Sequence, residues 1–217
     1  MKKLIFFLAL LLTVAAKAQD VSYGLTGRFG AYKTIVSSSE SIGSNNQYRP
    51  GLQLEVGAWV KLKVAEKSSV QFYVLQAIER QSGGTIRAVD SYGNDIADLK
   101  TRYGNLSIGG AAVYLYQLND RLCMGAGVGS RYNLAAIMVM QKVEYGVGYA
   151  VDSNDYYANT YHRKLKVFVP LEAQVKLSQR IQLVGQVQVP LSNRIAAAES
   201  AFKERDLGLT VGVNYTL

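Results

Sequence analysis

The sequence predicts an all-β fold, namely an eight-stranded antiparallel up-and-down transmembrane β-barrel. Two observations lead to this prediction. Apolar and polar residues alternate with a period of two through most of the chain after Gln19, which is the period of a β-strand with two unlike faces. The connections between the alternating stretches are short and long in strict turn, as in barrels that cross a membrane with tight turns on one side and long loops on the other.

The N-terminus has the three parts of a secretory signal peptide. A basic start precedes the apolar run 4–12, and an Ala16-Lys17-Ala18 cleavage site follows. The run is shorter than the roughly 20 apolar residues that span a bilayer as a helix. We therefore expect residues 1–18 to be the signal peptide, cleaved after Ala18, and residues 19–217 to form one barrel domain. The chain has a net charge of +8, but no block of like charges indicates a nucleic-acid partner.

Eight stretches of the mature chain show the alternation. The face that we assign outward is uncharged and dominated by Leu, Val, Ile, Ala and Tyr. The opposite face carries the charged residues and many glycines, as a narrow lumen with little room for side chains requires. The stretches span residues 21–31, 52–62, 70–78, 104–118, 122–132, 165–177, 181–191 and 207–217.

The connections place both termini and all short turns on one side. The short ones are 65–69, 119–121 and 178–180, and the long ones are 33–49, 82–102, 133–164 and 192–205. The third long connection continues to alternate, which predicts that the fifth and sixth strands extend into a projecting hairpin. A ten-stranded barrel is the competing count, and it requires additional turns at 152–155 and near Lys164.

The inward charges predict an ionic network that plugs the barrel and makes it rigid. Pairing Val64 with Val70 places Glu55 opposite Glu79, and two adjacent carboxylates in a confined lumen need cations nearby. The expected members are Arg28, Glu55, Lys61, Glu79, Arg131, Lys166, Glu172 and Lys176. The alternative is a set of solvated residues in a narrow water-filled pore.

Two prolines fall on the inward face of the sixth and seventh strands. Pairing Leu177 with Leu183 places Pro170 opposite Pro190. Because proline has no N–H to donate to a ladder, we expect a local break or bulge between these two strands.

No motif predicts catalysis, a metal or a cofactor. The only histidine, His162, has no His-x-Ser pairing around it, and the turn at 152–155 lacks the glycine and distal glutamate of an EF-hand loop. The glycines at 125–129 sit at period two inside a strand, whereas a dinucleotide site needs a strand-to-helix turn. Cys123 is the single cysteine, so no intramolecular disulfide forms.

The C-terminus carries a resemblance. Residues 207–217 alternate to the end, with Tyr215 third from last, and this resembles the terminal strand that the outer-membrane assembly machinery recognises, although Leu217 stands where phenylalanine is usual. Residues 102–134, with a strand, an Asn-Asp turn and a Gly-x-Gly-x-Gly strand, resemble the outer-membrane β-barrel family of Bacteroidota. The pattern of most of the mature chain is similar to that of small OmpX/OmpA-like barrels. The resemblance implies the outer membrane of a Gram-negative bacterium, with an assembly signal at Leu209, Val211, Val213, Tyr215 and Leu217.

The expected function is non-enzymatic: a barrel that displays external loops for adhesion, ligand capture or docking of a partner protein. The loops are rich in tyrosine, which suits contacts with a protein or a glycan, although stacking along the projecting hairpin explains the same residues. The tyrosines are Tyr48, Tyr92, Tyr145, Tyr149, Tyr156, Tyr157 and Tyr161. The other expected partners are outer-membrane lipid and, during biogenesis, the assembly machinery.

Two alternatives remain at this point. A soluble periplasmic lipocalin-like barrel would turn the apolar face inward around a lipophile. A lipid A-modifying outer-membrane enzyme would use His162 at the outer rim.

Overall fold

The computed structural model describes residues 20–38, 49–89, 92, 95–144, 148–150, 163–193 and 202–217. The expected signal peptide and His162 lie outside these residues. The strands are β1 (Asp20–Ser38), β2 (Gly51–Ala65), β3 (Ser68–Val89), β4 (Asp95–Gln117), β5 (Leu122–Glu144), β6 (Gly148–Ala150), β7 (Leu165–Lys176), β8 (Ile181–Pro190) and β9 (Phe202–Thr216). Among the described residues, no helix has the length and apolar character needed to cross a bilayer.

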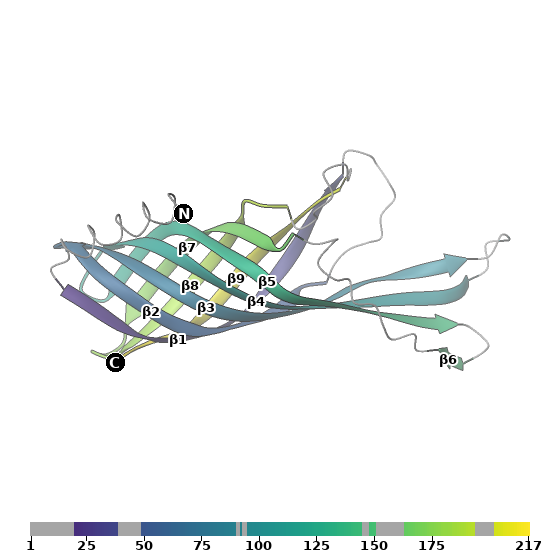
Figure 1. Cartoon of the computed structure of the whole chain (residues 1–217), viewed down its shortest axis with the longest axis horizontal. Helices are drawn as coiled ribbons and strands as arrows, with labels where there is room; N and C mark the ends of the chain where they lie inside the picture. Colours follow the sequence, from purple (N-terminus) through teal and green to yellow (C-terminus); the bar gives the residue numbers. More distant parts are fainter. Residues whose placement is uncertain are drawn as a thin grey trace.

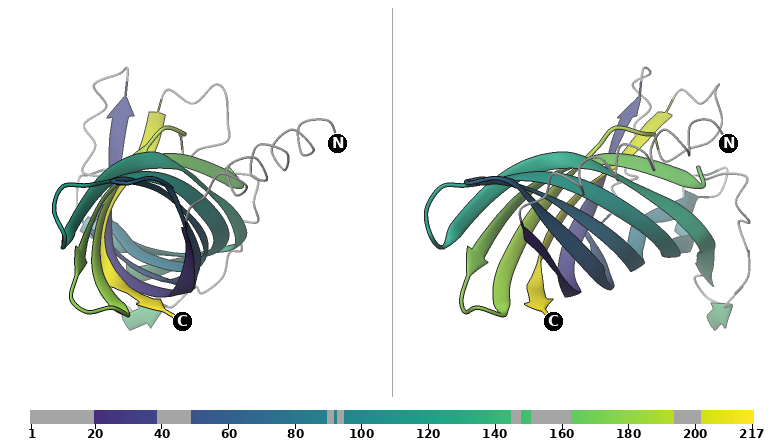
Figure 2. Two further views of the ribbon diagram at one scale, coloured as in Figure 1. Left: turned by 90° about the vertical axis from the view of Figure 1, so that its left-hand side faces the viewer. Right: turned by 60° about the vertical axis from the view of Figure 1, so that its left-hand side comes forward.

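Eight of the strands close into a barrel. Each strand pairs antiparallel with its neighbours in the order β1-β2-β3-β4-β5-β7-β8-β9, and β9 returns to pair with β1. The left view of Figure 2 looks along the axis of the resulting ring. Among the described residues, the short β6 pairs with the far end of β5, through residues 142–144. The predicted closed, eight-stranded antiparallel barrel is thus confirmed.

The two faces of the wall differ as the alternation predicts. Phe29 on β1 is 57% exposed, whereas its neighbour Arg28 is 1% exposed. On β9, Val211 is 59% exposed and Thr210 is fully buried. The wall therefore has an apolar outer surface and a polar inner surface, the reverse of a water-soluble barrel.

The three short turns lie together at one end of the barrel, which we call the turn end; the opposite end is the loop end (Figure 1). In the β4–β5 turn the Asn119 side chain accepts hydrogen bonds from the backbone N–H groups of Arg121 and Leu122, both at 2.9 Å. In the β7–β8 turn the Ser178 hydroxyl accepts from Arg180 and Ile181. Such local side-chain bonds explain why Asn and Ser begin these turns.

The predicted register of β2 and β3 is wrong by two residues. Leu62, not Val64, pairs with Val70, because β2 continues to Ala65 and the turn consists of only two residues. Glu55 therefore faces Ala77 instead of Glu79.

The predicted register of β7 and β8 is also wrong by two residues. Lys176 pairs with Gln182, because the backbone N–H of Leu177 donates to Ile181 across a tighter turn. Pro170 consequently faces Gln188, and Pro190 faces Phe168. The break caused by Pro170 lies on its other side, where no β5–β7 pair is formed between Ala126–Leu171 and Gly129–Phe168.

The strands continue beyond the loop end in two projections (Figure 1). One consists of β3, β4 and β5, paired as far as Val89–Asp95 and Ala97–Glu144. The other is the ribbon of β1 and β9, paired as far as Ser38–Phe202. The expectation that the fifth and sixth strands, β5 and β7, extend together as a projecting hairpin is therefore wrong, because β7 does not extend with β5. The extended β5 pairs with β4 as far as Ala97–Glu144 and with β6 near its end, whereas its pairing with β7 stops at Tyr132–Leu165.

Candidate functional site

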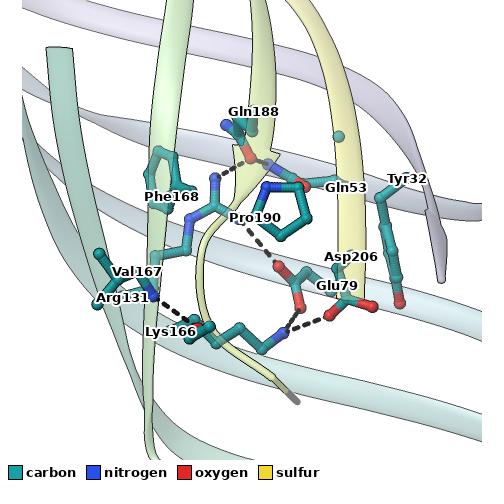
Figure 3. Close-up of a pocket in the computed structure, with 12 residues that line it drawn as sticks. Tyr32, Gln53, Glu79, Arg131, Lys166, Val167, Phe168, Gln188, Pro190 and Asp206 are labelled. Atoms are coloured by element: carbon teal, nitrogen blue, oxygen red, sulfur yellow. Dashed lines mark hydrogen bonds and ion pairs between the residues drawn. The ribbon is translucent and has the colours of Figure 1, made fainter. Parts of the chain in front are cut away.

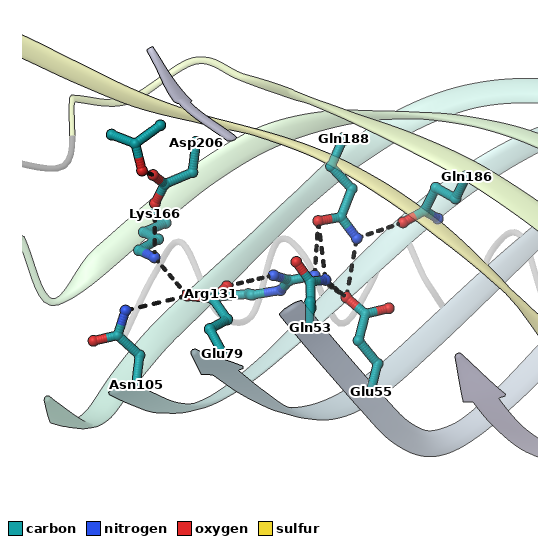
Figure 4. A network of polar contacts seen from close by, with 10 residues as sticks. Gln53, Glu55, Glu79, Asn105, Arg131, Lys166, Gln186, Gln188 and Asp206 are labelled. Carbon is teal, nitrogen blue, oxygen red and sulfur yellow. Dashed lines mark hydrogen bonds and ion pairs between the residues drawn. The ribbon is translucent and has the colours of Figure 1, made fainter. Parts of the chain in front are cut away.

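The centre of the lumen is occupied by Arg131 of β5. Its Nη1 donates to Glu79 Oε1 at 2.9 Å, and its Nη2 donates to Glu55 and, at 2.9 Å, to Gln188 Oε1 (Figure 4). Arg131 faces Gly109 on β4, where a Cβ would collide with the arginine side chain. One guanidinium thus bridges carboxylates from β2 and β3. Its positive charge offsets the repulsion between Glu55 and Glu79 in the lumen.

The loop end is crossed by a second bridge. Lys166 Nζ on β7 lies 2.9 Å from Glu79 Oε2 and 3.1 Å from Asp206 Oδ2 on β9, as Figure 3 shows. The Thr34 hydroxyl on β1 lies 2.7 Å from Asp206 Oδ1 and 3.0 Å from Gln81 Oε1 on β3. Polar contacts therefore connect β1, β3, β7 and β9 across the mouth.

The cavity beside this bridge is small. It has a volume of ≈ 30 Å³ and is lined by Glu79, Arg131, Lys166 and Asp206, among others. A space of this size holds on the order of one water molecule. Among the described residues, side chains therefore occupy most of the space around this bridge.

A second cluster lies closer to the turn end, around Glu172 of β7. Its Oε1 accepts hydrogen bonds from Tyr73 at 2.5 Å and Gln174 at 2.6 Å, and its Oε2 accepts from Gln186 at 2.7 Å. Arg28 completes the cluster, with Nη2 3.5 Å from Glu172 and the guanidinium stacked 4.2 Å above the Tyr73 ring. A Cβ at Gly212, opposite Arg28, would collide with the arginine side chain.

The two clusters form one connected network. Gln188 Nε2 donates to Glu55 at 3.0 Å and to Gln186 Oε1 at 2.9 Å, and Gln186 leads to Glu172. We call this the lumen network, and it runs from Asp206 at the loop end to Arg28 and Gln174. Its carboxylates are matched by nearby cations, so no large excess of charge remains inside.

An apolar layer also lies inside the barrel. Trp59, Tyr73, Leu75, Val113 and Leu115 are buried on the inner faces of β2, β3 and β4. The Trp59 indole N–H donates to the Leu25 carbonyl oxygen at 3.0 Å. The charged residues and glycines of this face predict a polar lining and do not predict the layer, although the period of two that includes Gly57 also includes Trp59.

The structure brings most of the expected network residues together. Arg28, Glu55, Glu79, Arg131, Lys166 and Glu172 all belong to the lumen network. Lys61 touches its edge through a 3.3 Å hydrogen bond to Gln174. Lys176 is exposed at the turn end and makes no ion pair with any described residue.

Sequence reasoning missed Asp206 and Thr34, because it placed both in or beside loops. The signal for them was present, since period two continued from Gly208 to Asp206 and from Tyr32 to Thr34. The expected assembly-signal residues Leu209, Val211, Val213, Tyr215 and Leu217 are all exposed on the outer face or at the end of β9.

The described residues hold no cluster of His, Cys, Asp or Glu arranged for a metal. Cys123 is half-buried at the turn end. The turn at 152–155 lies outside the described residues. The interior carboxylates form ion pairs with Arg28, Arg131 and Lys166. These pairs suit a structural role.

Comparison with known proteins adds likenesses of shape alone. No protein-family model and no curated protein sequence matches the chain. Among solved structures, Neisserial surface protein A matches with 14% identity over 92% of this chain and 100% of its own, at a TM-score of 0.44. Ail of Yersinia pestis matches with 10% identity over 89% and 99%, at 0.36. OprG of Pseudomonas aeruginosa matches with 12% identity over 91% and 94%, at 0.34.

OprG is an outer membrane protein, and all three likenesses concern the fold alone. The eight-stranded architecture of this chain rests on its own strand pairing. An apolar exterior around a mainly polar interior is the arrangement of a membrane-spanning β-barrel.

Proposed function

We propose that this chain spans the outer membrane of a Gram-negative bacterium as a plugged β-barrel, and that it displays its loop end to a protein or glycan partner without catalysing a reaction. The observation that carries this is the distribution of side chains across the wall. Leu54 and Val211 are 46% and 59% exposed on the outside, whereas Glu172 is 3% exposed inside. Hydrocarbon around the barrel favours this arrangement, and water around it would not.

The lipocalin-like alternative requires the opposite arrangement. It places the Leu and Val side chains around a central lipophile and the charges in solvent. The buried Arg28, Glu55 and Glu172 contradict it. The lipid A-modifying alternative depends on His162, which lies outside the described residues. The residues of the lumen network give no support to such an enzyme.

The display role is supported by the shape of the loop end. Two strand projections extend beyond the closed part of the barrel, and Tyr92, between β3 and β4, is 89% exposed. Tyrosine offers a large contact area at low conformational cost. A rigid, filled barrel would hold these projections in a fixed geometry for binding.

We expect single-cysteine variants to label on opposite sides of the membrane. In a Cys123→Ser background, Tyr92→Cys should react with a membrane-impermeant maleimide on intact cells. The matched control, Ser178→Cys in the β7–β8 turn, should react only after the outer membrane is permeabilised. The protein should also migrate faster in SDS gels before boiling than after. Equal labelling of both variants on intact cells would contradict the proposed topology.

Because the lumen is filled, we expect purified protein in planar bilayers to show no stable, large single-channel conductance. The Lys166→Ala variant should also show no such conductance, since the Glu172 cluster and the Trp59 layer lie closer to the turn end than Lys166 and still fill the lumen. A stable, large open level from the wild-type protein would show that the lumen is a water-filled pore.

A further inference from the structure

The turn end of the barrel contains two adjoining hollows. Their volumes are ≈ 210 Å³ and ≈ 180 Å³. Lys61, Gln117, Cys123 and Gln182 line both, so the hollows form one open basin, which we call the turn-end vestibule. Its floor is the lower edge of the lumen network, where Lys61 meets Gln174.

The vestibule is predominantly basic. Its cationic lining comprises Lys61, Lys63, Lys67, Arg121 and Lys176. The acidic groups that face them are Asp20, Glu66 and Asp120. The ion pair between Lys63 and Asp20 is long, at 4.0 Å, and solvent-exposed, so it neutralises little.

Lys61 is the central feature of this lining. Its side chain is half-buried, and its only hydrogen bond within the described residues goes to a neutral amide oxygen, Gln174 Oε1 at 3.3 Å. No carboxylate among these residues lies within ion-pair distance of Lys61. The Glu172 carboxylate acts on Lys61 only from beyond ion-pair distance, and a partly buried ammonium without a directly paired counter-ion is unfavourable. Lys176 adds a second cation to the same hollow.

We propose that the turn-end vestibule binds a small anion that carries phosphate or carboxylate groups, with Lys61 as its main counter-ion. The volume accommodates a ligand of several heavy atoms, and the neighbouring amide and hydroxyl groups of Gln117, Gln182 and Ser69 provide further polar contacts. The inference depends on the proposed function only for assigning this mouth to the periplasmic side.

The first test is calorimetric titration of the full-length barrel, in zwitterionic detergent at low ionic strength, with pyrophosphate as the probe. We expect saturable binding, weakened about tenfold in Lys61→Gln, because a partly buried charge is lost. Lys176→Gln should weaken binding less, since its exposed charge is screened. The control, Lys164→Gln, removes the same charge at the loop end and should bind as wild type. Each variant is checked for its heat-dependent shift in SDS gels.

Cys123 provides a second measurement. An anionic thiosulfonate reagent should modify it several-fold faster than a cationic one, pyrophosphate should protect it, and Lys61→Gln should reduce both effects. Protection by phosphatidylglycerol nanodiscs alone would identify a lipid headgroup as the source of the anion, and protection only by soluble anions would identify a free ligand.

Non-saturable heats, or equal weakening in Lys61→Gln and Lys164→Gln, would overturn the proposal. Either result leaves the labelling test of membrane topology unaffected, so the two failures can be told apart.

Discussion

Replacing Arg131 by alanine is expected to lower the free energy of unfolding by about 3–5 kcal/mol, the cost of removing one partner from a buried ion pair. The substitution leaves Glu55 and Glu79, which are 0% and 3% exposed, without the guanidinium that joins them. The measurement is the urea midpoint for unfolding from phosphatidylcholine vesicles. The control is Arg121→Ala, which removes the same side chain from an exposed turn.

A companion variant separates charge from packing. Arg131→Met combined with Glu55→Gln and Glu79→Gln removes the stranded charges and should recover part of the stability lost in Arg131→Ala. An Arg131→Ala midpoint equal to that of Arg121→Ala would show that the lumen network does not hold the barrel together.

Placing arginine at Val211 is expected to destabilise the barrel in lipid by about 2–4 kcal/mol, the cost of a cation on the lipid face near the bilayer midplane. Val211 points outward from β9 and lies midway along the part that pairs with both β1 and β8. The readout is again the urea midpoint in vesicles, with Ser178→Arg in the exposed turn as the control. If both variants unfold at the same urea concentration, the outer face does not meet hydrocarbon.

The faces of the strands could be predicted from sequence, whereas two of the registers could not. Period two assigns Phe29 outward and Arg28 inward, and this assignment survives any shift of two residues between strands. Glu55 therefore points into the lumen whether it faces Glu79 or Ala77. What selects the register is the turn, and the alternation is the same for two turns whose lengths differ by two residues.

The ends of the strands were the other source of error. Sequence reasoning ended the first strand near Ala31 and began the last at Leu207, because serine and charged residues beyond those points resemble loop composition. In the structure β1 and β9 continue as far as Ser38 and Phe202, since each has the other as a partner. Asp206, a central acceptor of the loop-end bridge, was missed for this reason alone.

The sequence predicts an ionic network inside the barrel, but it does not predict all the residues that form it. Charged residues on the inward face had to be compensated, which pointed to Arg131 and Lys166, and the structure places both beside glutamates. The glutamines Gln186 and Gln188, which connect the two clusters, carry no charge and so gave no such signal. Their role depends on cross-barrel distances that only the closed ring defines.

The pairing of β1 with β9 has a consequence for biogenesis. The seam that completes the wall joins β1 to β9, so Gly24 finds its partner Thr216 only after β9 has been synthesised. A truncated chain would remain an open sheet with two unsatisfied edges, which hydrocarbon penalises by several kcal/mol per exposed backbone group. Closure of the wall must therefore wait until β9 is available to pair with β1.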